Sequence, residues 1–347
     1  MNDRGFPARF SVNRHVAARP VLVYRRVKQM TVQPSRTGIP ADILALSHER
    51  DELRRKGKYD RADDLKRQIE EAGYGIKDNP HGAHLIILPS VEVDGTVYRT
   101  TRQVPSLLDE ADSCAFSVNI LACDSFEETK RCVESVARFA DGHAVEIVLV
   151  DNGSQDELNS WAKVMQRDDQ RLRLVTVARP VGEAEARNVG LKSSRGQYVL
   201  LLDSSVELTG DVFAPLGEVL SDSDVGITGL RGLLTEDMRH FEETNEQEVE
   251  AIAGLCMAFK RTLLRRAGLF DERYRFPYYM DIDFNFAVRD CGKIAVVTPG
   301  LPVECHPQLQ NAKLSDAERT RLTRRNFYRF LDKWGHRDDL LRQSPQP

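Results

Sequence analysis

The chain has 347 residues, of which 41% are hydrophobic and 29% charged, and its formal net charge is −4. A chain of this length and composition buries a substantial core, and its charge does not indicate nucleic-acid binding by the chain as a whole. No apolar run approaches the ~20 residues that span a bilayer, the N-terminus lacks the apolar core of a secretion signal, and the six cysteines contain no Cys-x-x-Cys pair. We therefore expect a cytoplasmic protein with neither a zinc site of paired cysteines nor a disulfide framework.

Residues 1–40 differ in composition from the rest of the chain. They carry eight Arg or Lys against one acid, contain four prolines and show no sustained periodicity. A short apolar stretch at 20–24 is the one potential strand. We predict a basic, mostly irregular arm, and we favour a disordered tail over a binding arm.

Residues 41–73 have the pattern of an antiparallel helical hairpin. Gly57 suits the turn and Gly73 the C-terminal cap. Apolar side chains recur at helical spacing on both halves and form facing stripes. They are Ile43, Leu44, Leu46 and Leu53 on the first half, and Ala62, Leu65 and Ile69 on the second. Two strand-like segments follow, 84–93 and 95–101, and the Asp94-Gly95 pair between them predicts a β-hairpin.

The helical hairpin resembles a piece of a known enzyme family. The run "RRKGKYDRADDLKRQIEEAGYGIKDNPHG" is similar to the C-terminal helical segment of cysteinyl-tRNA synthetases. The likeness covers about 30 residues, and none of the synthetase's catalytic motifs is present. It implies a borrowed module, which we expect to pack on its neighbour rather than to bind RNA.

From residue 116 onward, strand and helix patterns alternate. Buried strands are predicted at "FSVNILA", "VEIVLV", "RLRLVTV" and "YVLLL", and helical patterns separate them. Short buried strands joined by helices indicate an α/β fold, with a mostly parallel sheet covered by helices on both faces. Ligands bind such sheets at the carboxyl ends of the strands.

Three of these strands end in an aspartate: Asp124, Asp151 and Asp203. One aspartate at a strand end often only starts a turn or caps a helix, but three on one edge of a sheet indicate a site. Their chemistry suits ribose hydroxyls, a base N–H and a metal-bound diphosphate. A dinucleotide-binding domain would need a glycine-rich turn after the first strand, and "ACDSFEET" has no glycine.

Residues 116–306 resemble the family-2 glycosyltransferases, which have a GT-A fold and use a nucleotide-sugar donor. The likeness rests on "EIVLVDNGSQDE", "GEAEARNVGLKSSRGQYVLLLDSSVEL", "AGLFDERY", "YYMDIDFNFAVRDCG" and "VECHP", in the family's order and spacing. It implies a Rossmann-like GT-A domain at 113–310. The basic arm (1–40) and the two hairpins (41–112) precede this domain, and a basic helix and tail (311–347) follow it.

The resemblance also implies a role for individual residues. Asp281 stands where the family has its catalytic base, and Asp203 where it has the first acid of Asp-x-Asp. His306 stands where some members have a metal ligand, so the implied metal ligands are Asp203 and His306. The residues implied to bind the nucleotide sugar are Asp124, Asp151, Asn152, Arg187, Asn188, Asp203 and Ser205.

Two positions depart from the family pattern. Ser205 replaces the acid that usually binds the metal, and Met280 replaces the glutamate before the catalytic aspartate. A hydroxyl is a weaker ligand than a carboxylate for Mg²⁺ or Mn²⁺, which prefer hard anionic oxygens. Glu207 follows two residues later and is either a substitute ligand or a solvent-facing side chain. We therefore expect weakened binding of Mg²⁺ or Mn²⁺.

Two functions fit these residues. The favoured one is an inverting glycosyltransferase that moves a sugar from a nucleotide-diphosphate sugar to a hydroxyl of a glycan, a lipid-linked acceptor or a protein. The alternative is a non-catalytic nucleotide-sugar sensor or scaffold, whose N-terminal hairpin binds a partner or RNA.

Two further segments leave alternatives open. Residues 229–247 suit either a lid over the acceptor side or an ordinary surface loop. The helix predicted near the C-terminus has Phe327, Phe330, Leu331 and Trp334 on one stripe, which we expect to pack on its own domain. The alternative is peripheral contact with an anionic membrane.

Overall fold

The computed structural model describes residues 39–79, 82–244, 246–276, 278–307 and 315–342. The predicted basic arm, with its potential strand at 20–24, lies outside these residues. Within them, no helix combines the length and the apolar character needed to cross a membrane.

The predicted helical hairpin is present as α1 (Ala41–Arg55) and α2 (Tyr59–Glu71). Gly57 and Gly73 both have positive φ, as a turn and a C-terminal cap require. Ile43, Ala62 and Ile69 are buried, whereas Leu44 is exposed. A two-stranded antiparallel sheet of β1 (Tyr74–Asn79) and β2 (Gly82–Ile87) completes this segment.

The segment 84–93, expected as one strand, is divided in the structure. Residues 84–87 belong to β2, and the chain leaves the sheet at Leu88-Pro89-Ser90. Proline cannot donate a main-chain hydrogen bond, so a strand is readily interrupted there. The hairpin around Asp94-Gly95 is confirmed: β3 (Val91–Val93) pairs with β4 (Thr96–Tyr98), and β3 also adds to the edge of the main sheet.

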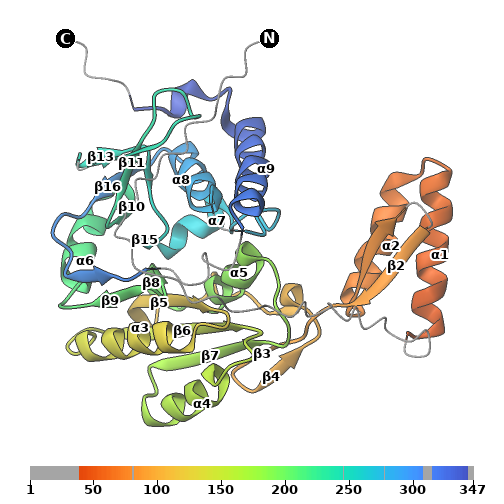
Figure 1. The fold of residues 1–347 in the computed structure, drawn as a ribbon, viewed down its shortest axis with the longest axis horizontal. Helices are drawn as coiled ribbons and strands as arrows, with labels where there is room; N and C mark the ends of the chain where they lie inside the picture. Colours follow the sequence, from red (N-terminus) through yellow and green to blue (C-terminus); the bar gives the residue numbers. More distant parts are fainter. Residues whose placement is uncertain (1–38, 80–81, 245, 277, 308–314, 343–347) are drawn as a thin grey trace, which may run out of the picture. The chain divides into compact units, whose positions relative to one another are not determined.

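The main sheet has ten strands in the order β13-β16-β10-β15-β8-β5-β6-β7-β3-β4 (Figure 1). Its centre is the predicted parallel set, and the flanking strands add antiparallel pairs. The central strands are β5 (Cys114–Ala122), β6 (Val145–Asn152), β7 (Leu172–Val177) and β8 (Gly196–Asp203); the outer ones are β10 (Val225–Gly229), β13 (Glu248–Val249), β15 (Cys256–Lys260) and β16 (Ile294–Val297).

Helices cover both faces of this sheet, as an α/β fold requires. One face packs on α3 (Phe126–Phe139), α4 (Leu158–Asp168) and α6 (Phe213–Ser221). The other packs on α5 (Glu183–Ser193), α7 (Leu264–Ala267) and α8 (Met280–Asp290). In β8, Leu200 and Leu202 face the first layer and Val199 and Leu201 the second, which explains its continuous apolar run.

Gly190 allows α5 to approach the sheet closely. A Cβ atom at this position would lie 2.4 Å from Asn119 Oδ1 and 2.9 Å from Val150 Cγ2. The glycine therefore sets the depth of α5, which carries Glu183 and Arg187.

Two small sheets lie beside the main one. β9 (Val206–Leu208) pairs with β17 (Val303–Cys305), and β11 (Gly232–Leu234) lies between β12 (Glu242–Thr244) and β14 (Ala251–Ile252). The segment 229–247 therefore includes two strands of a sheet, and its Met238 is buried.

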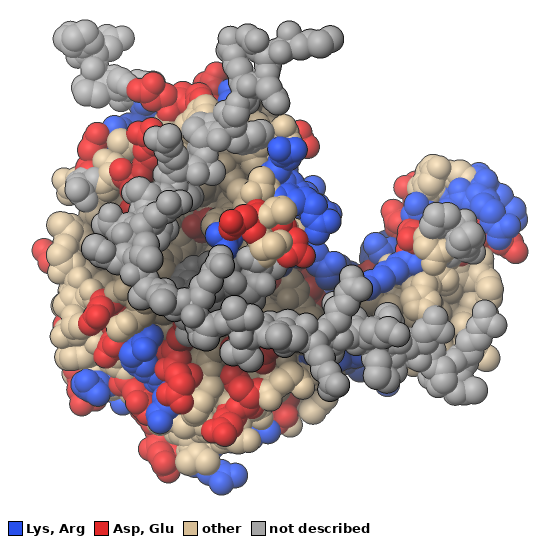
Figure 2. Space-filling model, in the orientation of Figure 1, with Lys and Arg blue, Asp and Glu red and all other residues tan. Residues whose placement is uncertain are grey.

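The C-terminal helix α9 (Asp316–Trp334) begins with a capping box between Ser315 and Glu318. Its residues Phe327, Phe330 and Trp334 are buried, as expected for a stripe that packs on its own domain. Trp334 Nε1 also donates to Asp283 of α8 at 2.8 Å. The sequence of α9 has more basic than acidic side chains, and Lys and Arg side chains gather over this helix in Figure 2.

Candidate active site

Asp124 and Asp151 shape the loop that follows β6. Asp151 is only 2% exposed, and its carboxylate accepts from the main-chain N of Ser154 and from Asn159 Nδ2, both at 2.9 Å. The exposed Asp124 accepts from the main-chain N of Gln155 at 2.7 Å. A carboxylate has about four acceptor positions, so both acids retain capacity for a ligand.

Asn152 has a local structural role. Its amide donates to the main-chain oxygen of Val181 at 3.2 Å and accepts from the main-chain N of Val181 at 2.9 Å. Gly153 beside it has φ +73°, and a Cβ there would lie 2.5 Å from the nitrogen of Pro180. The Asn-Gly pair thus fixes the segment that leads into α5.

Asp203 and Ser205 form a tight turn at the end of β8. Asp203 Oδ1 accepts from the main-chain N of Ser205 at 2.9 Å and from its hydroxyl at 2.6 Å. Ser205 is 1% exposed. Its hydroxyl proton is therefore directed at Asp203, and the pair does not provide the two anionic ligands of a complete Asp-x-Asp site.

Arg187 is buried with part of its guanidinium group unpaired. The residue is 7% exposed, and its Nε lies 3.4 Å from Glu183 Oε1. Its Nη1 is buried without a hydrogen-bond partner among the described residues. A buried, unpaired guanidinium N–H is costly, so this atom is suited to receive an anionic ligand.

Asn188, the next residue, points elsewhere. Its amide donates to the main-chain oxygen of Phe270 at 2.9 Å and accepts from the main-chain N of Phe270 at 3.0 Å. Both polar groups of the side chain are thus used to hold the segment that precedes α8.

Asp281 lies in the first turn of α8. One carboxylate oxygen accepts from the main-chain N of Gly254 at 2.7 Å, and the other from the main-chain N of Ile282 at 2.9 Å. Burial raises the pKa of Asp281, although these N–H groups and the charge of Arg187 oppose the rise. A carboxyl group with a raised pKa is a stronger base once it is ionised.

Glu183 belongs to the same neighbourhood, and the sequence interpretation missed it. Burial raises the pKa of Glu183; Arg187 opposes this, and the negative charges of Asp203 and Asp281 add to it. The Glu183 carboxyl group is therefore close enough to Arg187, Asp203 and Asp281 to respond to their charges. The available sequence signal was the spacing of Glu183 and Arg187, which are four residues apart on a predicted helix.

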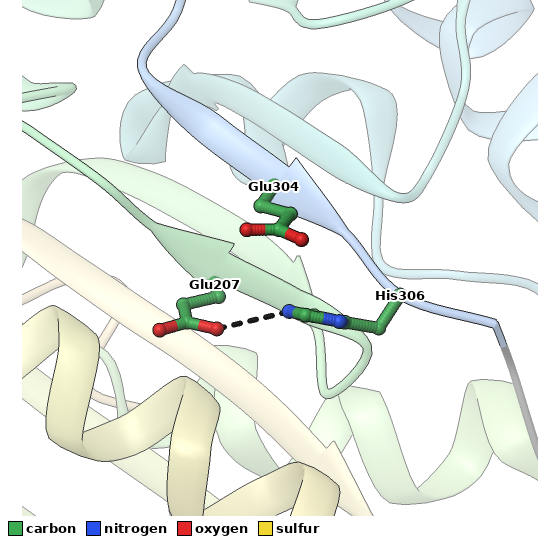
Figure 3. A group of neighbouring side chains, drawn as sticks. All are labelled: Glu207, Glu304 and His306. Atoms are coloured by element: carbon green, nitrogen blue, oxygen red, sulfur yellow. Dashed lines mark hydrogen bonds and ion pairs between the residues drawn. The ribbon is translucent and has the colours of Figure 1, made fainter.

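His306 lies just after β17, next to the Asp203 turn. Its main-chain N donates to the oxygen of Ser205 at 2.9 Å, and its Nε2 lies 2.9 Å from Glu207 Oε2. Glu304 completes a group whose three ligand atoms all lie within 4.8 Å of one another (Figure 3). Asp203 is not part of this group.

Comparisons with known proteins show which family and which fold this domain is similar to. Residues 117–286 match the family model described as glycosyl transferase family 2. The chain is 26% identical over 198 residues to the uncharacterized glycosyltransferase EpsJ of Bacillus subtilis (strain 168), covering 50% of this chain and 55% of that protein. It is 33% identical over 97 residues to an N-acetylglucosaminyltransferase of Bradyrhizobium elkanii, covering 27% of this chain and 53% of that protein. It thus spans about half the length of these curated relatives.

A solved structure shows the same fold. The crystal structure of GalNAc-T7 with UDP, GalNAc and Mn²⁺ superposes with a TM-score of 0.56 at 18% identity, covering 65% of this chain and 49% of that chain. The structure therefore has the GT-A fold, and the family match and the relatives support glycosyl transfer by this domain.

Proposed function

We propose, from this family-2 type of GT-A domain, that the protein is an inverting glycosyltransferase that uses a nucleotide-diphosphate sugar. The observation that carries the proposal is the carboxylate of Asp281, which main-chain N–H groups hold within the field of Arg187, together with the Nη1 of Arg187, which has no partner among the described residues. A base, and a cation with an N–H group free to meet the leaving diphosphate, are the two components that inverting transfer uses at the reacting centre. The UDP and GalNAc in the GalNAc-T7 structure support this class of donor.

Asp281 is the proposed base. It accepts the proton of the acceptor hydroxyl while that oxygen attacks the anomeric carbon and the nucleoside diphosphate leaves. Main-chain N–H groups hold both carboxylate oxygens, so the side chain is oriented before the acceptor arrives. General-base catalysis of this kind contributes about 10²–10⁴-fold to the rate.

Arg187 is the proposed donor of positive charge to the leaving diphosphate. Its unpaired Nη1 is buried, where a charge-assisted hydrogen bond is stronger than in water. In many metal-dependent transferases a Mg²⁺ or Mn²⁺ ion supplies this charge. The Asp203–Ser205 turn does not fit the acidic pair that would hold the ion, because the Ser205 hydroxyl donates to Asp203.

The acceptor class is a hydroxyl of a glycan, a lipid-linked carrier or a protein. A hollow beside α9 is lined by Arg273, Arg325, Arg329 and Lys333, together with Tyr328 and Asp332, and this excess of cations suits an acidic acceptor or an anionic membrane surface. We place the enzyme in the cytoplasm, where nucleotide sugars are available.

The alternative is a non-catalytic sensor of nucleotide sugars. Ser205 and Met280, which replace two acids of the family pattern, favour it. A sensor would bind nucleotide without turnover and would use the hairpin at 41–73 to contact a partner.

The test is release of nucleoside diphosphate from UDP-, GDP- and dTDP-sugars by the full chain. We expect turnover with one donor class and its loss in Asp281→Asn. The control is Asp290→Asn at the other end of α8, where Asp290 pairs with Arg337. Nucleotide binding without turnover would establish the sensor, and equal turnover in Asp281→Asn would remove Asp281 as the base.

A further inference from the structure

The ribbon of β9 and β17 carries a group of side chains with the chemistry of metal ligands. We propose that Glu207, Glu304 and His306 bind one divalent cation of the Mn²⁺ or Zn²⁺ class (Figure 3). This ligand set lies outside the Asp-x-Asp turn and uses neither of its side chains.

The strand register brings the two carboxylates together. Glu304 is paired directly with Glu207 across the antiparallel ribbon. Val206 and Leu208, on either side of Glu207, are buried in the core, so Glu207 projects from the other face of the ribbon. Directly paired residues share a face, and like charges in that position repel each other. A cation between the two carboxylates would convert this repulsion into attraction.

The third ligand, His306, is already in place. Its Nε2 lies 2.9 Å from Glu207 Oε2, and the ligand atoms of all three residues lie within 4.8 Å of one another. Ligands bound at about 2.0–2.2 Å from one ion are separated by about 3 Å when adjacent, so small side-chain rotations suffice. Two carboxylates and an imidazole suit Mn²⁺ and Zn²⁺. Glu304 is exposed, which leaves room for water or a ligand oxygen on the ion.

A plain ion pair is the competing explanation. Glu207 contacts His306 and also lies 3.5 Å from Arg131 Nε, so its charge is balanced without a metal. In that case Glu304 is not a metal ligand, and Glu304→Gln would leave any binding of Mn²⁺ by the protein unchanged. Glu304 is therefore the residue that separates the two explanations.

The site also has a potential place in catalysis, a step that rests on the proposed function. The hydrogen bond between the main chains of His306 and Ser205 fixes the cluster next to the Asp203 turn. A cation here would supply charge to the donor's diphosphate from a different ligand set, which would compensate for Ser205.

The experiment measures Mn²⁺ binding to the full chain by electron paramagnetic resonance, without nucleotide, and repeats it in competition with Zn²⁺. We expect one Mn²⁺ per chain, with affinity reduced about tenfold or more in Glu304→Gln and in His306→Gln. The matched control is Glu92→Gln, an exposed glutamate in the middle of the short strand β3, and its affinity should not change.

A second readout is thermal stability. Without metal, Glu304→Gln should melt at or above the wild-type temperature because repulsion is removed, and added Mn²⁺ should raise the melting temperature of the wild type only. Binding of neither Mn²⁺ nor Zn²⁺ at millimolar concentration, or undiminished binding in Glu304→Gln, would overturn the proposal. The measurement contains no nucleotide, so its result does not depend on whether the protein is an active transferase. Failure of the metal site would likewise not decide the proposed glycosyl transfer, which the turnover experiment tests separately.

Discussion

Removal of the N-terminal segments tests where the catalytic domain begins. We predict that deletion of residues 1–88 leaves a folded domain, whereas deletion of residues 1–112 does not. Val91, Val93 and Val104 are buried against the main sheet and α5. Burial of each such side chain contributes about 1.5–3 kcal/mol, so their loss together costs about 5–9 kcal/mol.

The longer deletion also removes hydrogen-bond partners of a buried arginine. Arg261 is 3% exposed, and it donates to the main-chain oxygens of Leu107 and Glu110 and to the carboxylate of Asp112. A buried ion that loses its partner costs about 3–5 kcal/mol. The sum is comparable with the 5–15 kcal/mol by which domains are typically stable.

The assay compares soluble yield, thermal unfolding and nucleotide binding for the chains 89–347 and 113–347. We expect cooperative unfolding and retained binding for the first, and aggregation or a broad transition for the second. Equal stability of the two chains would refute the reasoning and would restore the boundary at 113. An unfolded 89–347 chain would show that the helical hairpin is needed to complete the core.

Three substitutions give independent tests. Asn188→Ala leaves the main-chain N–H and C=O of Phe270 unpaired, which should cost about 2–4 kcal/mol in chemical denaturation; unchanged stability with weakened nucleotide binding would instead make Asn188 a donor ligand. Glu183→Gln should unfold at a higher temperature than the wild type at pH 7. Because the pKa of Glu183 is raised in the folded protein, its stabilising contribution is present below the ordinary glutamate pKa and is lost as the pH rises through the raised value. The higher unfolding temperature of the variant should therefore disappear near pH 4. A higher unfolding temperature that persists in acid would contradict this cause. Ser205→Asp places a second carboxylate against Asp203 and should lower the melting temperature unless Mn²⁺ is added; equal melting with and without Mn²⁺ would show that this turn binds no metal.

The central strands and the acids at their ends were predictable because the signal is local. Buried runs such as residues 145–150 identify a strand without its neighbours, and Asp151 follows directly. Parallel strands end on one edge, so the position of Asp124, Asp151 and Asp203 followed from topology alone.

The partners of the site residues were not predictable in the same way. Asn188 is hydrogen-bonded to Phe270, and Glu207 to His306. Each of these contacts joins segments that are distant in the chain. The pairing of β9 with β17, which brings Glu304 opposite Glu207, depends on the closure of the whole domain. Pro89 was a local signal for the break in the segment 84–93. The antiparallel pairing of β3 with β7 joins distant segments and had no such local signal.

The stereochemistry of donor hydrolysis tests the central claim most directly. With water as the acceptor, proton NMR of the first turnovers reports the anomeric configuration of the released sugar. The account predicts inversion relative to the donor, and the signal should be absent in Asp281→Asn because no base activates the water. Release with retained configuration would contradict single displacement with Asp281 as the base.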